Sequence, residues 1–296
     1  VAFDIFLIVF GAVFFLEVLK GIGVIENISF YLESISKDYR VQVILLAWFF
    51  INFIEGMAGF GTPGAVVAPI LISIGLSPLA AVVISVLGNS SAGAFGAVGT
   101  PIRVGFAGLD VTGVPWLTVL FNAVGLLVPV FMIWVVAKEQ NEERKENVTE
   151  ALPFALWSGF LFVLSSVLTV GLGQEFVSVI GSLLAIILAI LSIKIGLFVP
   201  KNVRVLKNHQ QTKMSLPLVK VVLPYLAVFV LLILGKAVLK SVVINFPWGY
   251  QYTFSIFNPG LIFFLTGIPF AWRWGTKGLI KDNLKTALKR TIDPFI

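Results

Sequence analysis

The sequence predicts an all-α integral membrane protein, a polytopic helical bundle with a re-entrant hairpin and a broken helix. Of its 296 residues, 58% are hydrophobic and only 12% are charged, with a mean hydropathy of +1.01. A soluble domain is typically about 45–50% apolar and about 25% charged. Several apolar stretches also reach the roughly 20 residues that cross a bilayer as a helix. One apolar region, 41–102, is interrupted repeatedly by glycine and proline, which predicts irregular helices there.

The predicted spans share an apolar run of membrane-crossing length. They are 2–25, 114–137, 151–170, 176–199, 217–239 and 258–275. A last, amphipathic segment, 277–296, carries lysines between leucines and isoleucines over 277–292, and we expect it to lie at the membrane interface. We treat 1–296 as a single transmembrane domain, with the irregular region at 41–104 and further spans over 114–275.

Basic residues between the spans predict the orientation. The segment 194–220 carries six lysines and arginines and no acid, so it is expected on the cytoplasmic side. Counting back along the chain then places 138–150 inside and 103–113 outside. Within the first span, Glu17 and Lys20 are three residues apart and are expected to pair in a structural role.

The composition excludes several function classes. The chain has no cysteine, and His209, expected to be solvated in the basic loop, is its only histidine. Thiolate, disulfide and histidine-rich sites are therefore excluded, and no cofactor or metal is expected. No G-x-x-x-x-G-K-[ST] loop supports ATP-driven transport. The net charge of +6 suits membrane topology rather than nucleic-acid binding, and no histidine, cysteine or carboxylate constellation indicates an enzyme.

Two breaks interrupt the region 41–102. "VQVILLAWFFINFI" is a short apolar helix of about fourteen residues that stops at "EGMAGFGTPG", and the run over 65–75 follows. A further helix, "LSPLAAVVISVL", stops at "GNSSAGAFGAVGTP". Relative to alanine, glycine destabilises a helix interior by about 1 kcal/mol and proline by about 3. We therefore predict a re-entrant hairpin over 41–75 and a broken span over 78–102.

Both breaks end in Gly-Thr-Pro. Because proline is favoured in the first helical turn, each Gly-Thr-Pro predicts the start of a half-helix, with Thr62 or Thr100 as a candidate N-cap. Free N–H groups and the positive dipole end at such a start suit an anionic ligand. Discontinuous helices of this kind build the midplane sites of many secondary transporters.

The two breaks also carry a family resemblance. Residues 54–102 resemble the signature region of the L-lactate permease family, in which E-G-A-A-G-F-G-x-P is followed by N-[ST]-x-x-x-x-F-G-A-x-G-x-P-I. The first element is matched by Glu55, Gly56, Ala58, Gly59, Phe60, Gly61 and Pro63. The second is matched by Asn89, Ser90, Phe95, Gly96, Ala97, Gly99, Pro101 and Ile102. Met57 stands where the family usually has alanine.

The resemblance implies a proton symporter that imports lactate and related 2-hydroxymonocarboxylates such as glycolate across the cytoplasmic membrane. It also implies two inverted repeats, of which this chain holds one plus part of the rest. The partners are then the organic anion, a proton, the lipid bilayer, and either a missing second half or a second copy in a homo-oligomer. Two alternatives stay open: a carrier of the same architecture for another organic anion, such as a dicarboxylate, and a truncated or split fragment that does not transport.

Glu55 is the candidate proton-coupling residue, since ionisable groups within spans mark relays. Its alternative role is to hold the hairpin by capping free N–H groups. Residues at the two breaks are the candidates for substrate binding: Gly59, Gly61, Thr62, Asn89, Ser90, Ser91, Gly99, Thr100 and Arg103. Hydroxyls in membrane helices also serve as interhelical contacts, and an arginine at a span end also anchors at the interface.

Overall fold

The computed structural model describes residues 2–59, 62–106, 109, 113–140, 144–206, 216–239, 241–245, 251–255 and 257–292. His209 lies outside these ranges. The chain divides into two compact units, which we describe separately. The hairpin unit comprises residues 27–214, and the terminal unit comprises residues 1–26 with 215–296.

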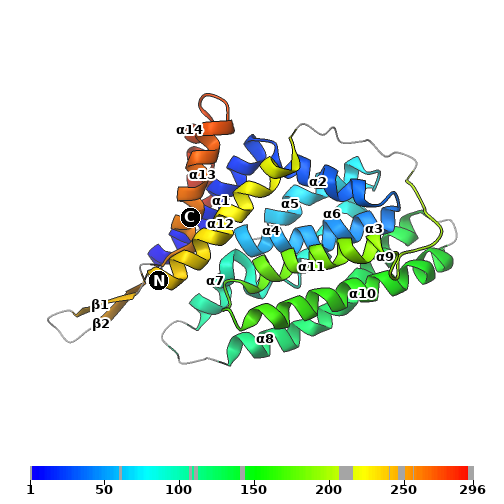
Figure 1. The fold of residues 1–296 in the computed structure, drawn as a ribbon, viewed down its shortest axis with the longest axis horizontal. Helices are drawn as coiled ribbons and strands as arrows, with labels where there is room; N and C mark the ends of the chain where they lie inside the picture. The colour runs from blue at the N-terminus through cyan, green and yellow to red at the C-terminus, as the bar shows by residue number, and fades with distance from the viewer. Residues whose placement is uncertain are drawn as a thin grey trace. The chain divides into compact units, whose positions relative to one another are not determined.

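The hairpin unit is entirely helical in its described part (Figure 1). Helix α2 (Val24–Ile35) begins in the terminal unit and continues into the hairpin unit. The other elements are α3 (Tyr39–Val43), the π-helix η1 (Ile44–Phe50), α4 (Ile51–Ala58), α5 (Thr62–Ser73), α6 (Pro78–Asn89), the 3-10 helix η2 (Gly93–Phe95), α7 (Gly96–Gly105), α8 (Val114–Asn122), the 3-10 helix η3 (Ala123–Leu127), α9 (Val128–Gln140), α10 (Arg144–Val170) and α11 (Val177–Lys194).

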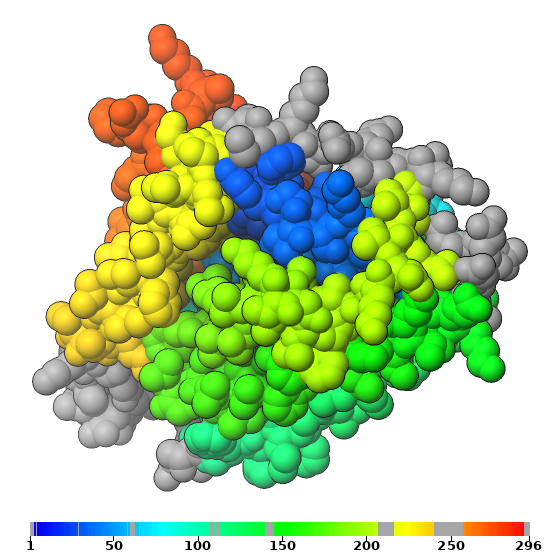
Figure 2. All heavy atoms as spheres, turned by 45° about the vertical axis from the view of Figure 1, so that its right-hand side comes forward, coloured from blue at the N-terminus to red at the C-terminus, as the bar shows by residue number. Residues whose placement is uncertain are grey.

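A single buried rod organises this unit. Helices α3, η1 and α4 follow one another without interruption, and the stretch Tyr39–Met57 is buried throughout. Helix α11 packs along the rod and α10 packs against α11; Figure 2 shows α10 (green) and α11 (yellow-green) side by side on one face. Helix α6 crosses η1 so closely that a Cβ on Gly88 would overlap the carbonyl oxygen of Ala47.

Four predicted spans, 114–137, 151–170, 176–199 and 217–239, are confirmed with shifted ends. The span 2–25 is found only as one arm of a bent pair, and the helix in place of 258–275, Pro259–Trp274, has 16 residues and is not among the described helices of membrane-crossing length. Five helices of the described residues are long and apolar enough to cross a membrane, and up to seven if each bent pair counts as one span. The chain is therefore a multi-pass membrane protein. The first hairpin arm is longer than the expected fourteen residues, because Asp38 caps the helix upstream by accepting a hydrogen bond from the Arg40 N–H. The arm Tyr39–Met57 has 19 residues.

Arg40 anchors the base of this rod in a buried ionic network. Its guanidinium donates to both carboxylate oxygens of Asp38, at 3.0 and 2.7 Å, and to Glu150 at 2.9 Å. It also donates to the carbonyl oxygens of Asn147 and Asn202. The network therefore joins α3, α10 and the segment after α11 at one end of the unit, which agrees with the expected placement of 138–150 and 194–220 on the same side.

The terminal unit packs three long helices and one amphipathic helix. These are α1 (Ala2–Gly21), α12 (Leu218–Val238), α13 (Pro259–Trp274) and α14 (Leu279–Ile292). Helices α1 and α13 approach backbone to backbone, since a Cβ on Gly11 would overlap the carbonyl of Gly260. The expected pair of Glu17 and Lys20 is present at 3.1 Å, and Arg290 of α14 also donates to Glu17 at 2.8 Å.

A two-stranded ribbon in the terminal unit was not predicted. Strands β1 (Ser241–Asn245) and β2 (Gln251–Ser255) pair antiparallel, with Ser241 opposite Ser255. The sequence "SVVIN" of β1 contains three β-branched residues in a row, which is a strand signal. The strand is only five residues long and lies among much longer apolar runs, so its pattern does not stand out in the sequence. The fold class is unaffected.

Replacing Arg40 by alanine should destabilise the protein by about 3–5 kcal/mol, because Asp38 would keep a buried charge without its partner. The matched control is Arg290→Ala, whose side chain is 50% exposed and pairs at the surface, and which should cost about 0–1 kcal/mol. Thermal unfolding of the purified full-length protein in detergent measures both. Equal losses for the two variants would contradict the buried network as an anchor.

Candidate functional site

The first break forms the tip of a helical hairpin. Helix α4 ends at Gly59, which has φ 63° and ψ −162°, a conformation that L side chains rarely adopt. Helix α5 begins at Thr62 and packs against both α4 and η1, so the chain turns back on itself. This confirms that the first Gly-Thr-Pro starts a half-helix. Gly61 lies outside the described residues, and Thr62 is described only as the first residue of α5.

The second break separates α6 from the regular part of α7 by a bend of 58° between Pro78–Asn89 and Gly93–Gly105. Three consecutive residues have left-handed backbone angles: Ala97 (φ 42°), Val98 (φ 57°) and Gly99 (φ 74°). For a β-branched residue such as Val98 this conformation is an outlier, which persists only where the surroundings enforce it. Helical geometry resumes at Thr100, so the second half-helix also starts at a Gly-Thr-Pro.

The two breaks meet. A Cβ on Gly59 would lie 2.7 Å from the Cβ of Ala97, and a Cβ on Gly96 would lie 2.6 Å from Oε1 of Glu55. The methyl at Gly59 would also meet the backbone nitrogen of Ala97 at 2.8 Å, so this glycine is required for the approach, whereas a methyl at Gly96 would displace the Glu55 carboxyl group. We call Glu55, Gly59, Gly96 and Ala97 the break junction. It brings the acid of the hairpin against the backbone of the broken helix.

Glu55 is 4% exposed and lies one turn before the hairpin tip. A carboxylate in such a position is unfavourable when charged and is neutralised readily by a proton or a cation. Gly96 lies against it, and the kink that follows Gly96 contacts the hairpin tip through Ala97 and Gly59. The junction therefore holds a buried carboxyl group beside the backbone of the broken helix.

Thr100 and Gly99 lie beside the junction, whereas Arg103 is farther along. The hydroxyl of Thr100 donates to the carbonyl oxygen of Ala97, so it satisfies a carbonyl at the kink, and its expected N-cap role stays a prediction. Gly99 lies against the backbone of Gln174, with 2.8 Å between a built Cβ and the Gln174 carbonyl oxygen. Arg103 is partly buried in the last turn of α7, at the opposite end of that helix from the kink.

Ser90 and Ser91 belong to a separate pocket of about 290 Å³ on the α8–α9 side of the second break. Its polar lining includes Asn122, whose amide donates to the carbonyl oxygen of Ser91 at 3.1 Å. Asn89 immediately precedes the pocket, and its buried Oδ1 has no hydrogen-bond partner among the described residues. The structure therefore divides the predicted binding residues between the break junction and this pocket.

Two asparagines were missed by the sequence reasoning. Asn122 lies in the pocket, and Asn52 lies in the rod one turn before Glu55, with its amide donating to the carbonyl oxygen of Trp48 at 2.6 Å. Both are side-chain amides inside apolar runs, which is a signal for a functional position in a membrane span. Neither asparagine belongs to the glycine-rich motifs that predicted the other site residues.

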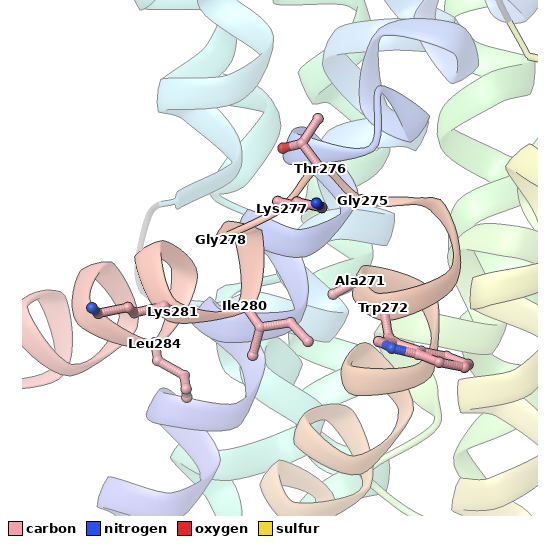
Figure 3. Close-up of a pocket in the computed structure, with 9 residues that line it drawn as sticks. All are labelled: Ala271, Trp272, Gly275, Thr276, Lys277, Gly278, Ile280, Lys281 and Leu284. Carbon is pink, nitrogen blue, oxygen red and sulfur yellow. The ribbon is translucent and has the colours of Figure 1, made fainter.

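The terminal unit holds another pocket, of about 480 Å³, between the end of α13 and the start of α14 (Figure 3). Ala271, Trp272, Ile280 and Leu284 line it, while the amine of Lys281 extends away from them. It contains none of the predicted site residues. Within the described ranges, no three Asp, Glu or His side chains gather closely enough to hold a metal ion.

A membrane-embedded hairpin whose tip meets a broken helix at a buried acid is typical of secondary transporters. Comparison with known proteins identifies the group: a family model described as L-lactate permease matches residues 1–268. The chain belongs to the L-lactate permease family, as the two glycine-rich motifs indicated.

Individual relatives agree with this assignment. The chain is 33% identical over 189 residues to an L-lactate permease of Streptococcus iniae, which covers 64% of this chain and 40% of that protein. It is 32% identical over 202 residues to the glycolate permease GlcA of Escherichia coli, covering 66% of this chain and 34% of that protein. The matched part is thus two fifths or less of the length of these relatives. No solved structure matches the chain.

The junction predicts that Gly59→Ala disrupts folding, because alanine at these backbone angles costs about 1–3 kcal/mol and its methyl would also collide with Ala97. The matched control is Gly93→Ala, since a Cβ there would meet nothing within 4 Å. Expression and thermal stability of the two full-length variants test this. A Gly59→Ala variant as stable as Gly93→Ala would show that the two breaks do not touch.

Proposed function

We propose that this chain forms part of a secondary active transporter that imports L-lactate and related 2-hydroxymonocarboxylates, such as glycolate, by proton symport across the cytoplasmic membrane. Membership of the L-lactate permease family supports the substrate class, because relatives are described as L-lactate and glycolate permeases. The observation that carries the mechanism is the break junction, where Glu55 lies against Gly96.

In this proposal the substrate carboxylate binds at the starts of the two half-helices. The N–H groups at the beginning of α5 and after the α7 kink point toward an anion there, and their dipoles favour negative charge. The hydroxyls and amides of the second break, on Asn89, Ser90 and Ser91, supply hydrogen bonds for the substrate's polar groups. Arg103 contributes a positive charge that attracts the anion toward the site.

Glu55 carries the proton. When it is protonated, the loaded site holds one substrate anion beside a neutral acid. When it is ionised, its charge repels the substrate carboxylate. Binding of a proton and of lactate are therefore expected to favour each other, which is the linkage that symport requires. The remainder of the site is proposed to come from the part of the full-length protein that this chain does not include.

Uptake of labelled L-lactate into proteoliposomes containing the full-length protein tests this proposal. We expect an inward proton gradient, acidic outside, to accelerate uptake by the unmodified protein. In Glu55→Gln the gradient should have no effect, because an amide cannot bind and release the proton. The matched control is Glu146→Gln, an acid whose side chain is 69% exposed at the start of α10, which should keep the gradient response.

Retention of the full gradient response in Glu55→Gln would refute the proton role of this residue. Competition by unlabelled acids tests the substrate class in the same vesicles. Glycolate should compete with L-lactate and succinate should not. The reverse order would favour the dicarboxylate carrier of the same architecture.

A further inference from the structure

Three helices of the hairpin unit bring polar side chains to one level of the membrane core. Helices α4 and α11 touch where Gly56 lies against the backbone of Ser178. At the other end of the rod, Arg40 donates to the carbonyl oxygen of Asn202, just beyond α11. The two helices therefore run antiparallel, and residues one turn on from the crossing lie opposite one another.

This arrangement places Ser182 of α11 at the level of Asn52 of α4, each one turn from the Gly56–Ser178 crossing. On the other side of α11, Gly181 lies against the backbone of Ser165 in α10. Asn52, Ser165 and Ser182 consequently lie at the same level along the helices, one turn from Glu55 toward Arg40. We call these three residues the polar triad. Each of them is 0% exposed.

Each member of the triad has a polar atom without a hydrogen-bond partner among the described residues: Oδ1 of Asn52, Oγ of Ser165 and Oγ of Ser182. One N–H of the Asn52 amide donates to the carbonyl oxygen of Trp48, whereas its acceptor oxygen has no partner among the described residues. Burying an unpaired polar atom in apolar surroundings is unfavourable. Three such atoms at one level call for a common partner.

The neighbouring hydroxyls behave differently. Ser166 donates to the carbonyl oxygen of Phe162 at 2.9 Å, and Thr169 donates to that of Ser165 at 2.8 Å. These are the bonds that a hydroxyl makes when it is simply accommodated in a helix. Ser165 and Ser182 make no such bond within their helices, so this kind of accommodation does not account for them.

We propose that the polar triad binds water and forms a proton path to Glu55, an inference that rests on the proposed proton symport. Water is small enough for a buried site and both donates and accepts, so it suits an amide acceptor and two hydroxyls together. Asn52 accepts from the water and orients it. Each water or serine oxygen accepts one proton and releases another, so only the carboxyl group of Glu55 changes its protonation state.

Two transport modes of the reconstituted full-length protein separate this role from a structural one. Net L-lactate uptake driven by a proton gradient requires Glu55 to load and unload its proton. Exchange of labelled for unlabelled L-lactate without a gradient does not require Glu55 to release its proton, because the proton stays bound while the loaded carrier reorients. We expect Ser182→Ala and Ser165→Ala each to slow net uptake roughly tenfold, which is less than the loss of a proton-transfer group that acts directly on the reactant. Each variant should change the rate of exchange by less than about twofold.

Ser166→Ala is the matched control, since it removes a buried α10 hydroxyl that is already bonded within its helix. It should leave both modes as in the unmodified protein. The proposal would be overturned if Ser182→Ala slowed exchange as much as net uptake, as a packing defect would, or if it slowed neither. If the unmodified protein showed no gradient-driven uptake of L-lactate, the proposed symport would fail instead.

A direct observation of the site does not depend on transport. A structure of the full-length protein at a resolution that shows ordered water should place a water within hydrogen-bond distance of Ser182 Oγ and Asn52 Oδ1. Hydroxyls of Ser165 and Ser182 bonded to carbonyl oxygens, with no water between the helices, would overturn the proposal whatever the uptake measurements show.

Discussion

The close approach of Gly59 and Ala97 is the contact on which the rest of the hairpin unit depends. Backbone released from a helix inside a membrane must find partners within the protein, and here the two breaks pack directly against each other. The left-handed backbone at Ala97, Val98 and Gly99 lies where the hairpin tip contacts it. Because a Cβ at Gly59 would collide with Ala97, the glycine at this position decides whether the breaks can meet.

The rod from Tyr39 to Met57 runs through the core and leads to this contact. Its base is held by the Arg40 network, and its upper end presents Glu55 to the broken helix. One rigid element thus links a buried ion network at one end of the unit to the acid at the break junction.

Much of the fold follows from local sequence, whereas the site depends on contacts between distant segments. Gly-Thr-Pro predicted where two half-helices begin, because the backbone preferences of glycine and proline act locally. It could not show that Gly59 meets Ala97, or that Ser90 and Ser91 line a different pocket from Glu55. The bond between the Thr100 hydroxyl and the Ala97 carbonyl oxygen depends on the kink, which the local sequence does not show. The positions of Asn52 and Asn122 beside the site follow only from how the helices pack around them.

The central claim is that the substrate site extends from the break junction to the pocket at Ser90 and Ser91, and chemical protection tests it most directly. The chain contains no cysteine, so Ser90→Cys in a full-length background without other cysteines provides a single thiol at an exposed position of the second break. Saturating L-lactate or glycolate is predicted to slow its modification by a small water-soluble thiol reagent. An unchanged rate of modification, in vesicles that take up L-lactate, would contradict the account.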